Sequence, residues 1–221
     1  MITRVFLAAR RADMTTEACL AHWRGHHAAI GAGLPRVRAY VQNHGVLENG
    51  HFLLPYPGFD IMPELDWDDL DDMDAAIDSP AHEQDSVDDE ANFIDTSRTG
   101  LAVTRRHVLI DGAPAADAVK LITFIRRAPS ASDSSLQAVL TSPYPQRVGA
   151  AGPARQEVLI TIPDRPGRQP FTAQAIELLW FASAGDALAW VASDAYHRAA
   201  WSLSGIAFGT ERLIARPQRI V

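Results

Sequence analysis

The chain has 221 residues, of which 47% are hydrophobic and 21% charged, a balance typical of a globular protein with one large or two ordinary domains. Its net charge of −7 argues against a nucleic-acid partner, because phosphate backbones are bound by an excess of Lys and Arg. No apolar run is long enough to cross a bilayer, no signal peptide is recognisable and Cys19 is the only cysteine, so we expect a cytoplasmic protein without membrane partners or an internal disulfide.

The stretch after the first predicted strand, residues 2–10, has the spacing of an amphipathic helix. Its buried stripe recurs at steps of three and four and consists of Leu20, Trp23, His27, Ile30 and Leu34. Thr15 or Thr16 supplies an N-cap, and two glycines and a proline between residues 31 and 35 end the helix. The sequence therefore predicts a helix whose buried face includes a histidine.

The next predicted strand, residues 37–47, has an unusual polar face. Tyr40, Gln42 and His44 alternate along it and lie on the same side, because successive side chains of a strand point to opposite faces. Burying these groups beneath the helix costs free energy unless each finds a polar partner. This face therefore indicates a pocket with a chemical role.

The rest of the first half completes a β-α-β-β-α-β order, the ferredoxin-like unit. Its predicted elements are a loop at 48–58, a strand at 59–65, a helix with an acidic first turn within 66–82, a polar segment at 83–98 and a strand at 101–110. Asp60, Met62 and Glu64 alternate along the strand at 59–65, so these side chains either face one cavity or, for the two acids, keep a strand edge in contact with solvent.

The order of elements then begins again after a short linker. We predict a first repeat at residues 1–111, a linker at 112–118 and a degenerate repeat at 119–221. The second repeat lacks the histidines and the tryptophan of the first predicted helix, and VLITI replaces YVQNH on its second strand. We therefore expect one chemical site, in the first repeat, within an intrachain pseudo-dimer. A further homodimer is left open.

Three separated segments resemble the EthD family of the dimeric α/β-barrel superfamily: MTTEACLAHWRGHHAAI, LPRVRAYVQNH and DDEANFID. The family's Trp-Arg-x-x-His pattern falls on Trp23, Arg24 and His27, and its acidic segment ending in Phe and Asp falls on residues 89–95. The resemblance covers residues 1–110 well. It implies an α+β fold, with tandem ferredoxin-like repeats pairing their antiparallel sheets into an α/β barrel. Family members are linked to breakdown of ethers and aromatics, and relatives are cofactor-free oxygenases, lactone isomerases, decarboxylases or dehydratases.

The residues favour an enzyme of lyase or isomerase type that acts by proton transfer on a hydrophobic cyclic or aromatic small molecule, without a cofactor or metal. His27 or His44 is the expected base, because an imidazole titrates near neutral pH, with Tyr40 as a donor. The predicted substrate contacts are Trp23, Gln42, Arg24, Asp60 and Met62. Arg24 is expected to pair either with the acidic helix or with an anionic substrate.

Three alternatives remain open at this stage. A monooxygenase without a cofactor would use the same base to form a carbanion that reacts with oxygen. A non-catalytic module would bind the small molecule and release it unchanged. A zinc or copper site is the third, because Cys19, His22 and His26 have helical spacing that could align three ligands, although no HExxH pattern is present.

Overall fold

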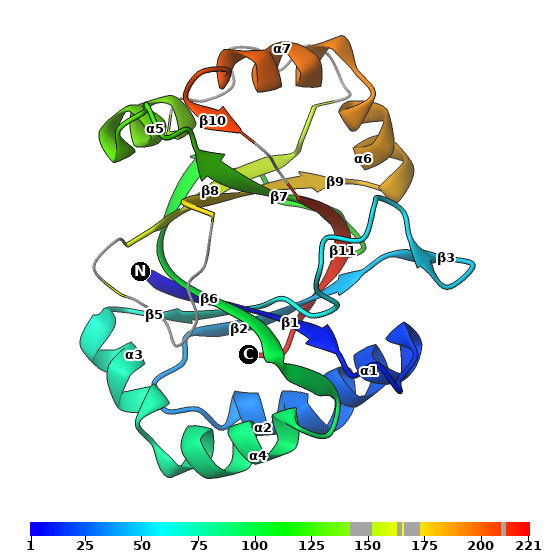
Figure 1. The fold of residues 1–221 in the computed structure, drawn as a ribbon, viewed down its shortest axis with the longest axis vertical. Helices are drawn as coiled ribbons and strands as arrows, with labels where there is room; N and C mark the ends of the chain where they lie inside the picture. Colours follow the sequence, from blue (N-terminus) through cyan, green and yellow to red (C-terminus); the bar gives the residue numbers. More distant parts are fainter. Residues whose placement is uncertain (142–151, 163–164, 166–172, 209–210) are drawn as a thin grey trace.

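The computed structural model describes residues 1–141, 152–162, 165, 173–208 and 211–221, in which two repeats share one closed sheet (Figure 1). The first repeat comprises β1 (Ile2–Arg10), α1 (Thr16–His22), the π-helix η1 (Trp23–His27), α2 (Ala28–Ala32), β2 (Ala39–Gly45), β3 (Leu47–Glu48), β4 (His51–Phe52), β5 (Pro63–Trp67), α3 (Leu70–Ile77), the π-helix η2 (Ala81–Ser86), α4 (Val87–Glu90) and β6 (Ile94–Ile110). The second comprises β7 (Val119–Arg127), α5 (Asp133–Leu140), β8 (Arg155–Thr161), β9 (Ala175–Phe181), α6 (Ala184–Val191), α7 (Asp194–Ser202), β10 (Ala207–Phe208) and β11 (Arg212–Arg219).

The sheet closes into a barrel because each repeat lends its last strand to the other. Within the described residues the strand order is β10-β7-β11-β2-β5-β1-β6-β8-β9, and an antiparallel pairing of β7 with β9 completes the ring. Strand β6 pairs with both β1 and β8, while β11 pairs with both β7 and β2. The helices of the first repeat cover one side of the ring and those of the second repeat the opposite side (Figure 1). The predicted tandem ferredoxin-like fold is therefore confirmed.

The first helical stretch begins and ends where the sequence indicates, but a π turn interrupts it. The Thr15 hydroxyl accepts a hydrogen bond from the Ala18 backbone N–H at 3.2 Å, and the stretch ends at Ala32. Between them, η1 widens the helix over Trp23–His27. Trp23 is fully buried and His27 is 9% exposed. A π turn within an α-helix is rare and is frequently found at functional sites.

Other boundaries differ from the prediction for local reasons. The expected loop at 48–58 contains the hairpin β3–β4, and three apolar side chains near it pack against the core of the second repeat: Val46, Leu53 and Leu54. The strand expected at 59–65 runs from Pro63 to Trp67, and Ile61 makes only an isolated bridge with Ala8. Helix α3 begins after Asp69, whose carboxylate accepts from the Asp72 N–H at 2.9 Å. No helix among the described residues is long and apolar enough to span a membrane.

The barrel interior has an apolar part built by both repeats. Side chains from β1, β7, β8, β9 and β11 meet in one buried cluster that includes Val5, Ile122, Leu159, Leu178 and Leu213. Separate apolar clusters lie between the sheet and the helices of each repeat. The two sheet faces therefore bury apolar side chains in different layers.

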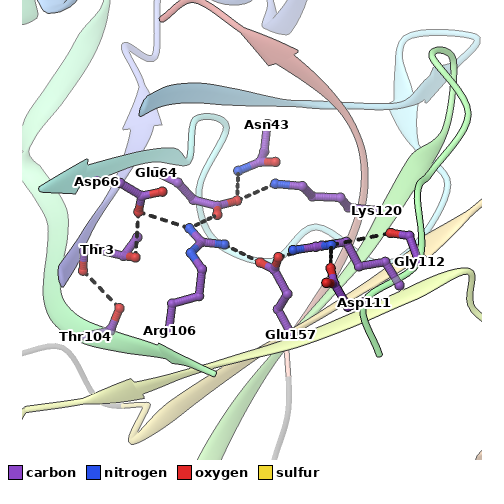
Figure 2. A network of polar contacts seen from close by, with 11 residues as sticks. Thr3, Asn43, Glu64, Asp66, Thr104, Arg106, Asp111, Gly112, Lys120 and Glu157 are labelled. Carbon is purple, nitrogen blue, oxygen red and sulfur yellow. Dashed lines mark hydrogen bonds and ion pairs between the residues drawn. The ribbon is translucent and has the colours of Figure 1, made fainter. Parts of the chain in front are cut away.

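A charged network, the barrel network, lies in another part of the interior and links the repeats (Figure 2). Arg106 on β6 lies 2.8 Å from Glu64 and 3.1 Å from Asp66, both on β5, and pairs with Glu157 on β8. Lys120 on β7 lies 2.6 Å from Glu64. Burial alone would raise the pKa of Glu64, but Lys120 and Arg106 hold it at about 2. Glu64 is therefore ionised, and the ion pairs of the network fasten the two repeats together.

Candidate active site

The predicted polar face of β2 forms a chain of hydrogen bonds beneath η1. The Gln42 side-chain N–H donates to the backbone carbonyl of Trp23 and to the Tyr40 hydroxyl oxygen, each at 2.8 Å. A carbonyl can only accept, so the amide nitrogen of Gln42 must face Trp23 and the amide oxygen must face His44. That oxygen lies 2.9 Å from His44 Nε2, which is therefore the protonated nitrogen. Hence Nδ1 carries the free lone pair of the His44 imidazole.

His44 is prepared to accept a proton. It is 4% exposed, and its Nδ1 is buried without a hydrogen-bond partner among the described residues. The Trp23 ring lies 4.7 Å from the imidazole, centroid to centroid. Burial, helped by the charge of Arg24, lowers the pKa of His44 to about 4. The imidazole is therefore neutral at physiological pH, with Nε2 oriented by Gln42 and Nδ1 lacking a hydrogen-bond partner among the described residues.

Tyr40 is held as a neutral phenol by the same surroundings. Burial raises its pKa to about 12, although hydrogen bonds from Gln42 and Trp23 act in the opposite direction. Its ring lies against α2, where a Cβ on Gly31 would come within 2.6 Å of Tyr40 Cε1. Glycine at position 31 therefore allows the helix to approach the ring closely enough to fix it. Tyr40, Gln42 and His44 thus form a rigid relay.

A hollow of about 510 Å³, the His44 groove, opens beside this relay. Arg24 and Leu20 line it from the first helical stretch, and His44 lines it from β2. Arg216 and Gln218 line it from β11, the last strand of the second repeat. The groove is therefore built by both repeats, although its histidine comes from the first.

His27 belongs to a different cluster. Its Nδ1 lies 2.9 Å from Asp89 Oδ2, while His22 Nε2 lies 3.0 Å from Asp89 Oδ1 and His26 lies 3.7 Å from it. Asn92 also donates to Asp89, at 3.2 Å. Burial lowers the pKa of His27, although its hydrogen bond to Asp89 works against this. The predicted convergence of His27 with the polar face of β2 is therefore absent among the described contacts, because Asp89 draws the imidazole toward α4.

Asp60 and Met62 also lie away from the relay and from each other. Asp60 is 1% exposed and accepts from the Arg10 backbone N–H at 2.9 Å and the Tyr56 hydroxyl at 2.7 Å. Met62 is fully buried in the apolar cluster inside the barrel. The structure thus does not bring them into one cavity with Gln42.

Cys19 is separated from the two histidines considered with it for a metal site. Cys19 is fully buried in an apolar cluster with Trp23, and burial raises the pKa of its thiol to about 12. His22 faces Asp89 and stacks on Phe93, with ring centroids 4.7 Å apart. Among the residues that the structure describes, no group of three or more potential His, Cys, Asp or Glu ligands is arranged for a metal ion.

Sequence reasoning missed Asp89 and the barrel network. Asp89 lies in an acidic run whose members have the same appearance as solvated helix residues, and only the fold shows that it is 5% exposed and faces three histidines. The barrel network did leave a signal. Lys120 stands between Val119 and Leu121 in β7, and Glu157 directly precedes the apolar run 158–160 of β8, which indicates a buried polar contact.

Comparison with known proteins identifies a known domain in the first repeat. Residues 11–97 match the family model described as the EthD domain. The fold is similar to that of an anthrone oxidase-like protein, with 12% identity, a TM-score of 0.71, and 99% of this chain and 93% of that chain covered. No curated protein matches the sequence significantly.

Two candidate monooxygenases have similar structures. The one from Fusobacterium nucleatum has 9% identity and a TM-score of 0.61, with 99% of this chain and 93% of that chain covered. The one from Lactobacillus acidophilus NCFM has 12% identity and a TM-score of 0.56, with 100% and 94% covered. Identities this low show the fold alone. The first repeat thus contains a segment that matches the EthD domain, within a barrel built from two ferredoxin-like repeats.

Proposed function

We propose that this protein is an enzyme that removes a proton from a hydrophobic cyclic or aromatic small molecule in the His44 groove. The observation that supports this most strongly is the unpartnered Nδ1 of His44, buried beside a hollow of about 510 Å³. Leaving a buried acceptor without a partner costs about 1–3 kcal/mol. A site that retains such a group is a candidate for catalysis.

The relay assigns a role to each side chain. His44 Nδ1 takes a proton from an acidic C–H or O–H of the substrate and becomes an imidazolium. Gln42 Oε1 accepts from Nε2–H before and after the transfer, so the base keeps its orientation while its charge changes. Tyr40 holds Gln42 in place through its hydroxyl oxygen. Trp23 contacts the imidazole and limits its access to water.

His27 is the weaker candidate for the base. Asp89 orients its Nδ1, as a carboxylate orients the imidazole of a hydrolase. However, His27 does not line the His44 groove, and its hydrogen bond fastens η1 to α4. We therefore assign it a structural role, outside the proposed proton transfer.

Two outcomes are compatible with the same first step. The conjugate base can rearrange, eliminate or lose carbon dioxide, which would be lyase or isomerase chemistry. Alternatively, an electron-rich carbanion can react with dioxygen to form a C–O bond, which would be monooxygenase chemistry. The second outcome is favoured by the comparisons, since the similar structures include an anthrone oxidase-like protein and candidate monooxygenases.

Hydrogen–deuterium exchange tests the first step without knowledge of the product. Anthrone or a cyclic 1,3-diketone would be incubated with the protein in D₂O, and deuterium entry at the acidic carbon followed by NMR. We expect His44→Ala to reduce the catalysed rate at least about 100-fold, the usual contribution of a general base. Oxygen uptake measured in parallel separates the two outcomes.

His27→Ala is the matched control, because it removes a buried imidazole from the same helical stretch without touching the relay. It should retain most of the exchange. Equal exchange by the His44→Ala variant and the wild type would reject the proposal. Tight binding of the probe without any exchange would instead indicate a non-catalytic binding module.

A further inference from the structure

The cations of this protein fall into two groups that differ in their partners. Inside the barrel, Arg106 and Lys120 are each paired with a carboxylate (Figure 2). In the His44 groove, by contrast, Arg24 makes no hydrogen bond, ion pair or ring contact among the described residues. Arg216 has only a long contact, 3.5 Å, to the backbone carbonyl of Asp117. The groove therefore presents two guanidinium groups that lack an acidic partner in the part of the chain that the structure describes.

These two arginines come from opposite repeats and line one hollow. Arg24 belongs to η1 of the first repeat, and Arg216 belongs to β11 of the second. Arg216 lies opposite His44 in the β11–β2 register, so it is placed beside the proposed base. Among the described residues, Glu17 is the only carboxylate lining the groove, and it lies in the first turn of α1 near Gly50. The hollow is thus net positive in a chain whose net charge is −7.

From this arrangement we infer that the His44 groove binds a substrate that carries an anionic group, such as an aromatic carboxylate, between Arg24 and Arg216. Guanidinium groups are suited to this role because their planar N–H donors match the geometry of a carboxylate. The groove also has apolar walls at Leu20 and Leu47, which can contact a ring. The inference rests on the proposed function, and it names the class of substrate.

The anion would also affect the proposed base. Arg24 acts on His44 through its charge and lowers the pKa of the imidazole. An anionic group seated on Arg24 would offset that charge and make His44 a stronger base only when substrate is present. Proton abstraction would then be coupled to binding of the correct substrate. No redox step or additional reactant is needed, since the proton passes from the substrate to Nδ1.

Binding of benzoate and 1-naphthoate, compared with benzyl alcohol as a neutral analogue, tests the inference. Affinities would be measured by calorimetry at low and at physiological salt, and the His44 titration followed by NMR with and without ligand. We expect both carboxylates to bind more tightly than benzyl alcohol and to raise the pKa of His44. Arg24→Met and Arg216→Met should each weaken carboxylate binding about 10-fold or more, as expected for charge-assisted hydrogen bonds.

Arg38→Met is the matched control, because Arg38 precedes β2 but pairs with Asp68 outside the groove. It should leave carboxylate affinity unchanged, which separates a local contact from a general loss of positive charge. Equal binding of benzoate and benzyl alcohol, or unchanged affinity in both groove variants, would overturn the inference. The exchange rate of the His44→Ala variant reports on the proposed function separately, since it does not depend on the charge of the probe.

Discussion

The outer faces of β2 and β8, the second large strand of each repeat, show what distinguishes the two halves of this protein. On β2 the face beneath the helices consists of Tyr40, Gln42 and His44, with Trp23 above. On β8, Val158 packs in an apolar cluster with Leu136 and Leu140 of α5, and on the same face the buried Gln156 donates a hydrogen bond to Glu177 of β9 at 2.9 Å. One fold therefore supports a relay that contains a histidine in one repeat and a mainly apolar layer with one amide–carboxylate pair in the other.

The difference indicates which face serves stability and which serves chemistry. An apolar layer is stabilised by burial alone, at about 25 cal/mol for each Å² removed from water. A polar face must satisfy each buried group, and the relay does so for Gln42 while leaving His44 Nδ1 without a partner. Stability alone gives no reason to keep such a group. The second repeat thus closes the barrel and supplies one wall of the His44 groove.

The largest expected effect concerns the barrel network that both repeats share. Arg106→Met would leave three buried carboxylates without their common cation, and we expect the free energy of unfolding to fall by about 3–5 kcal/mol. Urea denaturation should show a single transition at a lower midpoint, because the network spans both repeats. Arg105→Met, an exposed neighbour on the same strand, is the control. Two separate transitions would mean that the repeats unfold independently.

A smaller loss of stability is expected when a side chain in the apolar layer of the second repeat is truncated. Leu136 is 2% exposed, and Leu136→Ala should reduce the free energy of unfolding by about 2–4 kcal/mol through the cavity that it leaves. The variant, kept under conditions in which it remains folded, should retain proton exchange on the probe substrate. His44→Ala should show the opposite pattern, with stability largely kept and exchange lost. Loss of exchange in both variants would contradict the assignment of chemistry to the first repeat alone.

The pH dependence of stability tests the polar face of the first repeat. His44 has a folded-state pKa of about 4, below its ordinary value of 6.5. Between these pH values His44 is protonated in the unfolded chain but neutral in the folded chain. Its contribution to the free energy of unfolding therefore decreases as the pH falls from 6.5 toward 4. The contribution is on the order of 2 kcal/mol. Chemical denaturation across this range should show a shallower fall for His44→Gln, and parallel curves would contradict the burial of a neutral imidazole.

Much of this arrangement could be predicted from patterns in the sequence. The order of elements predicted the tandem fold, because each amphipathic segment has one way to bury its apolar face. Alternation along β2 placed Tyr40, Gln42 and His44 together, and the structure joins them by hydrogen bonds. The partner of His27 could not be predicted, since Asp89 approaches it across 62 positions of sequence only after η2 and α4 have folded.

The ion pairs inside the barrel could not be predicted from the sequence either. Spacing along one strand identifies which residues share a face, but it does not identify the strand that closes against it. Glu64 and Lys120 are 56 positions apart and meet only because β11 brings β2 and β7 into one ring. The π turn of η1 was also missed, because a step of three or four residues fits an α-helix equally well.

The smallest expected change in stability comes from alanine substitutions at two glycines of the same helical stretch, and the two substitutions should act in opposite directions. A Cβ on Gly31 would press on the Tyr40 ring at 2.6 Å, so Gly31→Ala should destabilise the fold by about 1–3 kcal/mol and slow proton exchange by displacing the relay. Gly25 has open space around its Cβ position, and Gly25→Ala should stabilise the helix by about 0.5–1 kcal/mol. Thermal unfolding and the exchange assay would be compared for both variants. If Gly31→Ala lowered stability while exchange stayed normal, the ring position would matter for packing and not for the relay, and the assignment of Tyr40 to the site would fail.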